Sequence, residues 1–221
     1  MANRLRMDRP HIVGLLLAGG QGRRLDKAKG WCEVGGVPIV RRALAALAAV
    51  SDEIVAVGDA ELPADMPLRQ IADEAPGAGP LAAMLTGVQA ASADLYVVLA
   101  WDMPFVTAEL LQHLLAACQG VDAVVPHVGG RDQPLCAVYA ASCRPAIEGT
   151  LAEGVAKVGA FLERVSVRRL AEDELARFGD PECLFLNVNT PADLARAQSL
   201  TTPAAAPPHA PRPTRADRAR P

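Results

Sequence analysis

The chain has 221 residues, a formal net charge of −3 and 51% hydrophobic residues. It is long enough to bury a sizeable core, whereas its slightly acidic balance argues against a nucleic-acid-binding protein, which usually carries a basic excess. No run of 18 or more apolar residues is present, so we expect no membrane span, and residues 1–10 lack the apolar stretch of a signal peptide.

Composition divides the chain into three expected parts. We predict a flexible N-terminus over residues 1–10, a single domain over 11–200, and a disordered tail over 201–221, which is rich in proline and arginine and has no large apolar residue. The five cysteines form no CxxC pair, which favours free thiols in a reducing compartment. We therefore expect a cytoplasmic protein. The sequence leaves the oligomeric state open, and a monomer is the default expectation.

Apolar runs of strand length alternate with helical patterns from residue 11 onward. Strands are expected at residues 11–18, 52–59, 94–102, 122–128, 134–140, 167–170 and 183–188. Helices are expected at residues 37–50, 79–91, 107–118, 142–154 and 190–198. The alternation predicts an α/β fold, with a mostly parallel, Rossmann-like open sheet and helices on both faces.

Three of these helices begin with recognisable signals. Gly79 and Pro80 open the helix at 79–91, and Thr107 is expected to cap the helix at 107–118. For the helix at 190–198, Thr190 is the expected cap and Asp193 stands at the third helical position.

A glycine-rich loop with several cations follows the first strand, in the sequence LAGGQGRRLDKAKG at residues 17–30. Its glycines let a ligand approach the main chain, and cations at the carboxyl end of a strand indicate an anion such as phosphate. The chain has no GxxxxGK[ST] P-loop, and the loop lacks the third glycine of a dinucleotide fingerprint. The alternative for this loop is a surface hairpin with solvated charges.

Polar side chains follow other expected strands. Asp102 comes after the run LYVVLA and before Met-Pro, where a carboxylate can hold Mg²⁺ together with phosphate oxygens. Asp73 follows another expected strand end, and Asn187 and Asn189 follow the run CLFL. Each of these four residues also has a simpler interpretation, as a turn or capping residue. Together with the glycine loop they indicate a site for a nucleoside triphosphate and Mg²⁺.

The loop resembles the signature of the nucleotidyltransferases that activate sugars and cofactors. The shared pattern is a glycine pair (Gly19, Gly20), then Arg24, then Lys29. Four segments are most similar to the molybdenum cofactor guanylyltransferases of the MobA type: LAGG at the turn, GPLAAML after Asp73, DMPF at Asp102, and NVNTPADL near the end. The similarity runs in order over residues 12–198.

This resemblance implies a reaction and a set of roles. A phosphate of molybdopterin attacks the α-phosphate of GTP, and pyrophosphate leaves. Arg24 would stabilise the leaving pyrophosphate, Lys29 would hold the phosphates, and Asp102 would hold Mg²⁺. The nucleotide-binding residues implied are Leu17, Ala18, Gly19, Gly20, Lys29, Asp73, Gly79, Pro80 and Asp102, and the acceptor-binding residues are Asn187 and Asn189. Proteins that deliver the cofactor or receive the product are further possible partners.

Other functions fit parts of the same sequence. The nearest are a cytidylyl or sugar-phosphate nucleotidyltransferase of the same fold, because readout of the base lies largely in backbone geometry. A non-catalytic nucleotide-binding protein is a different class, and it is disfavoured by the joint presence of Arg24, Lys29 and Asp102. An NAD-dependent oxidoreductase is disfavoured by the missing fingerprint.

Overall fold

The structure is a computed structural model that describes residues 9–19 and 29–201. Almost all of the two predicted terminal segments, as well as Gly20 and Arg24, lie outside the described residues. Within the described part, no helix is long and apolar enough to cross a membrane.

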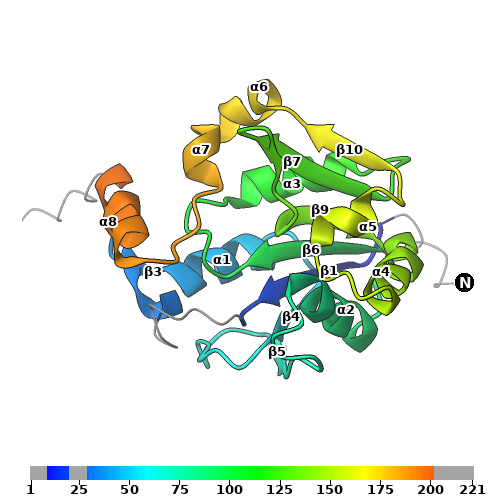
Figure 1. Ribbon diagram of the computed structural model, residues 1–221. Helices are drawn as coiled ribbons and strands as arrows, with labels where there is room; N and C mark the ends of the chain where they lie inside the picture. Colours follow the sequence, from blue (N-terminus) through cyan, green and yellow to red (C-terminus); the bar gives the residue numbers. More distant parts are fainter. Residues whose placement is uncertain (1–8, 20–28, 202–221) are drawn as a thin grey trace, which may run out of the picture.

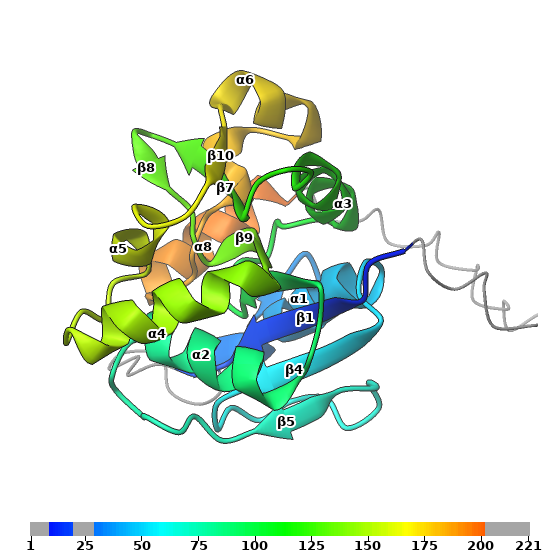
Figure 2. The same ribbon diagram turned by 90° about the vertical axis from the view of Figure 1, so that its right-hand side faces the viewer.

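Helices pack on both faces of a mixed, mostly parallel sheet (Figures 1 and 2). The strands are β1 (Ile12–Leu17), β2 (Glu33–Val34), β3 (Val37–Pro38), β4 (Glu53–Val57), β5 (Arg69–Ile71), β6 (Leu95–Ala100), β7 (Ala123–Val128), β8 (Arg131–Asp132), β9 (Cys136–Ala140) and β10 (Val167–Leu170). The α-helices are α1 (Ile39–Ala48), α2 (Pro80–Ala90), α3 (Ala108–Ala117), α4 (Arg144–Ala152), α5 (Val158–Leu162), α6 (Glu172–Leu175), α7 (Pro181–Leu184) and α8 (Pro191–Leu200). Single 3₁₀ turns lie at η1 (Lys29–Trp31), η2 (Ala141–Cys143) and η3 (Ala176–Phe178).

The strand order is β10-β7-β9-β6-β1-β4-β5, with β8 paired to β7 and a separate β2–β3 hairpin. β1 lies between β4 and β6 and is parallel to both, as the predicted fold requires. The exceptions are β9, which runs antiparallel between β6 and β7, and the short β8, which pairs antiparallel with β7. The predicted α/β fold with a mostly parallel sheet is therefore confirmed.

Every residue of β1 is buried, which explains why its sequence is a continuous apolar run rather than an alternating one. Ile12 and Leu16 point into the core that also holds buried residues of α1 and α3. Val13 and Leu15 point into the core on the opposite face, with buried residues of α2, α4 and α5. Figure 2 shows α2 and α4 on one side of the sheet and α3 on the other.

A third, smaller core lies beside the sheet, and we call it the lateral core. It consists of Val34, Ile39, Leu186, Val188 and Ala197. It therefore joins the β2–β3 hairpin, the first residue of α1, the segment before α8, and α8 itself. In Figure 1, α8 and β3 lie together on the side toward which the arrowheads of β1 and β6 point.

The prediction of a strand at residues 183–188 is wrong. Residues 181–184 form the short helix α7, whose start is capped by the Asp180 side chain accepting from the N–H of Glu182 at 2.9 Å. The apolar run that follows serves two cores, since Phe185 packs in the core of α1 and α3 and Leu186 in the lateral core. Asn187 and Asn189 therefore follow a helix and an irregular segment, and not a strand.

The predicted helix caps are confirmed. The Thr107 hydroxyl accepts from the N–H of Leu110 at 3.3 Å. Thr190 and Asp193 form a reciprocal capping box at the start of α8. This box lies next to the candidate site.

Candidate active site

The site lies where the strand order switches direction. The chain passes from β1 to β4 and β5 on one side and then returns to β6 on the other side of β1. The segments that follow β1 and β6 therefore leave the sheet next to each other, and the N–H of Trp101 donates to the carbonyl of Leu17 at 3.2 Å. This is the position at which open α/β sheets bind their ligands.

The glycine loop begins with its first residues packed against a neighbouring glycine. Leu17 and Ala18 have buried side chains, and the N–H of Ala18 donates to the carbonyl of Val57 at 2.9 Å. Gly58 has φ +126°, and a Cβ there would lie 2.6 Å from the carbonyl oxygen of Ala18. Only glycine permits this approach. Gly19 comes next and is exposed, so its backbone is available to a ligand.

Lys29 and Asp102 form a buried ion pair at the centre of the site. Lys29 Nζ donates to Asp102 Oδ2 at 2.6 Å and to Asn189 Oδ1 at 2.6 Å. The lysine is only 7% exposed and the aspartate 9%. Three residues that are far apart in the sequence thus meet at one ammonium group.

The second carboxylate oxygen of Asp102 has no such partner. Oδ1 is buried and, among the described residues, has no hydrogen-bond partner. A buried oxygen of this kind costs free energy unless a ligand satisfies it. No cluster of three or more His, Cys, Asp or Glu side chains that could hold a metal occurs in the described part of the chain. A single carboxylate oxygen of this kind can serve a cation such as Mg²⁺, which takes one or two protein carboxylates and fills its other positions with phosphate and water.

The turn that carries Lys29 packs on the residue before Asp102. A Cβ at Gly30 would lie 2.5 Å from Cζ3 of Trp101, so the ring lies directly against the bare Cα of the glycine. The loop after β6 therefore supports Lys29 in two ways, through the Asp102 carboxylate and through the Trp101 ring.

The remaining predicted nucleotide residues lie at the start of α2 and before it. Asp73 follows β5 by two residues, and its Oδ1 accepts from the N–H of Ala75 at 3.0 Å, which is turn chemistry. Gly79 is the N-cap of α2 with φ +100°, and a Cβ there would lie 3.2 Å from Cβ of Ala156. Within the described residues, no hydrogen bond or ion pair joins Asp73 to Lys29 or Asp102.

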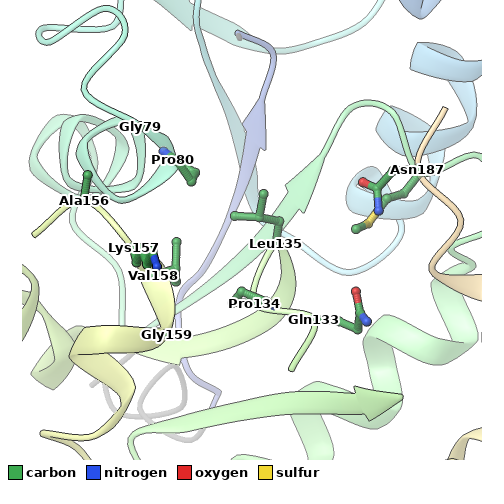
Figure 3. A pocket seen from close by; sticks show the side chains of 11 residues that line it. Gly79, Pro80, Gln133, Pro134, Leu135, Ala156, Lys157, Val158, Gly159 and Asn187 are labelled. Atoms are coloured by element: carbon green, nitrogen blue, oxygen red, sulfur yellow. The ribbon is translucent and has the colours of Figure 1, made fainter. Parts of the chain in front are cut away.

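A pocket of about 460 Å³ extends from the start of α2 (Figure 3). Figure 3 shows the amide side chains of Gln133 and Asn187 on one side of this pocket and Pro80 and Ala156 on the other. Its lining residues are Gly79, Pro80, Met103, Gln133, Pro134, Leu135, Ala156, Lys157, Val158, Gly159 and Asn187. Asn187 keeps its orientation partly by donating from Nδ2 to the carbonyl of Phe185 at 3.1 Å.

The structure thus brings Lys29, Asp102 and Asn189 into one cluster and places Gly79, Pro80 and Asn187 around an adjoining pocket. Asp73 takes part in neither set of contacts. Sequence reasoning missed Gly58, Trp101, Gln133 and Lys157. Of these, only the glycine after an apolar strand offered a local signal, since the others act through tertiary contacts.

The fold and the site are those of a nucleotidyltransferase, and comparison with known proteins confirms this class. The family described as the MobA-like NTP transferase domain matches residues 14–170. The chain belongs to this family, and the resemblance that the sequence motifs indicated is confirmed.

Relatives of similar length support the assignment. The chain is 37% identical over 189 residues to a probable molybdenum cofactor guanylyltransferase of Pelotomaculum thermopropionicum. This alignment covers 85% of this chain and 92% of the relative. It is 38% identical over 197 residues to the molybdenum cofactor guanylyltransferase of Cereibacter sphaeroides, with 86% and 96% covered.

Solved structures extend the similarity to the fold. The molybdopterin-guanine dinucleotide biosynthesis protein A of Archaeoglobus fulgidus superimposes with a TM-score of 0.70 at 30% identity, covering 85% of this chain and 97% of that chain. The 2-C-methyl-D-erythritol 4-phosphate cytidylyltransferase of Thermus thermophilus shares the fold alone, with a TM-score of 0.64 at 21% identity, covering 84% of this chain and 96% of that chain.

Proposed function

We propose that this protein transfers GMP from GTP to a molybdopterin-type molybdenum cofactor and releases pyrophosphate, which yields the guanine dinucleotide form of the cofactor. The observation that carries the proposal is the buried Lys29–Asp102 pair at the switch point, with Asp102 Oδ1 lacking a partner among the described residues. The names of the relatives support the choice of base and acceptor.

In this reaction, a phosphate oxygen of the acceptor forms a bond to the α-phosphorus of GTP. The bond from that phosphorus to the bridging oxygen breaks, and pyrophosphate leaves with the electron pair. Such a transfer needs positioning and neutralisation of charge rather than a covalent intermediate on the protein. Lys29 supplies a fixed positive charge for the phosphates, and Asp102 supplies a carboxylate oxygen for Mg²⁺.

Mg²⁺, when bound, would supply positive charge that neutralises the triphosphate. Asp102 is the residue that would hold it. The exposed backbone at Gly19 and the start of α2 at Gly79 and Pro80 would contact the nucleoside. Arg24, which lies outside the described residues, is proposed to act on the leaving pyrophosphate, as the family signature implies.

The side of the adjoining pocket that is lined by Gln133 and Asn187 is proposed to receive the acceptor. Pro134 and Leu135 provide apolar surface for a flat heterocycle, and the amides of Gln133 and Asn187 can each donate and accept hydrogen bonds at its polar edge. Lys157 adds a cation to the lining, which suits an acceptor that carries a phosphate. We also expect a cytoplasmic monomer that exchanges cofactor with delivery and acceptor proteins.

The test is pyrophosphate release by purified full-length protein with Mg²⁺ and molybdenum-loaded molybdopterin, run separately with GTP, CTP and ATP. Release with GTP alone is the expected result, and Asp102→Asn is the matched control for contaminating activity. Release mainly with CTP would keep the fold and chemistry but assign the cytidylyl reaction. No release with any nucleotide would overturn the proposal.

A further inference from the structure

A chain of hydrogen bonds runs from the start of α8 to the buried lysine. Asp193 Oδ2 accepts from the backbone N–H of Asn189 at 3.1 Å, and Asn189 Oδ1 accepts from Lys29 Nζ at 2.6 Å. The Asp193 carboxylate is held in turn by Thr190, whose N–H and hydroxyl each donate to Oδ2 at 2.8 Å. The capping box of α8 is thus connected to the centre of the candidate active site.

The same segment is attached to the other partner of the lysine. The N–H of Val188 donates to the backbone carbonyl of Asp102 at 2.9 Å, and the Val188 side chain is fully buried in the lateral core. Asn189 is the next residue, so its position is fixed relative to Asp102 from one side and relative to α8 from the other.

A lysine needs such fixing more than most cations do. Its ammonium group sits on a flexible four-carbon chain and has three donors. Within the described residues, Asp102 and Asn189 accept from two of them, which sets the direction of the group and leaves the third donor for a ligand. Asp102 is also the carboxylate proposed to hold Mg²⁺. Asn189 is therefore the hydrogen-bond partner of Lys29 that is left to direct the ammonium group.

We propose that Asn189 is a positioning residue that directs Lys29 toward the triphosphate, and that Asp193 and Thr190 hold Asn189 in place. The proposal rests on the proposed function, because it takes the triphosphate as the ligand of Lys29. It gives Asn189 a role on the donor side of the reaction, which differs from the acceptor contact implied by the resemblance.

A double-mutant cycle between Asn189→Ala and Lys29→Ala separates the two roles. The readouts are GTP affinity by calorimetry without Mg²⁺ or acceptor, and the kcat and acceptor KM of pyrophosphate release. We expect Asn189→Ala to weaken GTP binding and lower kcat by about tenfold each, with the acceptor KM unchanged. In the Lys29→Ala background, the same substitution should change either quantity by less than about twofold.

Two further variants test how Asn189 is held. Asp193→Ala should reproduce part of the Asn189→Ala defect. Asp193→Asn should keep most of the wild-type GTP affinity and kcat, because an amide oxygen can still accept from the Asn189 N–H. Gln198→Ala is the matched control on the same helix, since Gln198 Nε2 donates to the carbonyl of Glu33 at 3.0 Å and takes no part in the chain to Lys29. It should leave both readouts within about twofold of wild type.

Three results would overturn the proposal. The first is a full Asn189→Ala effect in the Lys29→Ala background, which would show that Asn189 acts independently of Lys29. The second is an effect confined to the acceptor KM, which would place Asn189 on the acceptor. The third is an equal loss from Gln198→Ala, which would mean that docking of α8 alone matters. Failure of the proposed function looks different: the wild type would release no pyrophosphate, while coupling of Lys29 and Asn189 in GTP binding would persist.

Discussion

The two large cores and the lateral core hold different parts of the active site. The large cores pack helices on both faces of the sheet and fix β6, which ends two residues before Asp102. The lateral core fixes the segment that carries Asn189 and packs against the hairpin that follows the Lys29 turn. Lys29 thus lies where the large cores meet the lateral core. The free energy of unfolding should therefore depend mainly on the large cores, and the alignment of Lys29 on the lateral core.

Removing the charge of Asp102 should have the largest effect. Asp102→Asn keeps an oxygen for Lys29 but removes the carboxylate proposed to hold Mg²⁺. We expect kcat for pyrophosphate release to fall by at least about 100-fold, with the secondary structure seen by circular dichroism unchanged. Retained activity in Mg²⁺ would exclude Asp102 from the metal site.

Truncating one side chain in each core tests the comparison directly. Leu114 on α3 is fully buried in a large core, and Leu114→Ala should lower the free energy of unfolding by about 2–5 kcal/mol. Val188→Ala in the lateral core removes two methyl groups and should cost only about 1–2 kcal/mol. Urea unfolding and kcat are measured for both. If Leu114→Ala lowers kcat more than Val188→Ala does, the division of roles is wrong.

Gly30→Ala should disturb the lysine without removing any group. The new Cβ would lie 2.5 Å from the Trp101 ring, so the turn or the ring must move, at a cost of about 1–3 kcal/mol. We expect weaker GTP binding in calorimetry together with a lower melting temperature. Gly149→Ala on α4 is the control, because its nearest neighbour would be 3.8 Å away and a helical alanine should stabilise the fold slightly.

The smallest expected effect is on the melting temperature at low pH, through protonation of the Asp193 carboxylate. Hydrogen bonds from Thr190 lower the pKa of Asp193 below its usual value. A lowered folded-state pKa contributes stability that is present above the unfolded pKa and is lost as the pH falls through the folded one. Asp193→Asn should therefore flatten the decline of melting temperature below about pH 4. An unchanged acid limb would show that the capping box adds no pH-dependent stability.

Much of the scaffold could be predicted because its signals are local. The apolar run of β1, the caps Thr107 and Thr190, and the carboxylate after β6 are each visible in a few consecutive residues. The prediction of a strand at residues 183–188 fails because an apolar run of this length fits a buried strand as well as a segment whose side chains are divided between two cores.

The contacts that align the lysine could not be predicted in the same way. The partnership of Lys29 with Asn189 joins residues 160 positions apart, and the packing of Gly30 on Trp101 exists only after β6 is in place. The strand end identifies Asp102 and the family signature identifies Lys29, whereas their burial and the unpartnered Oδ1 are visible only in three dimensions.

The sequence separation of Lys29 and Asn189 also has a consequence for biosynthesis. A chain that is still being translated can pair β1 with β4 and later with β6, so the Lys29–Asp102 contact can form early. The oxygen of Asn189 is supplied only by the last part of the folded chain, after residue 188 has left the ribosome. A product that ends before residue 189 would lack both the oxygen that Asn189 supplies to Lys29 and the Ala197 side chain of the lateral core, so we expect it to lack an aligned ammonium group.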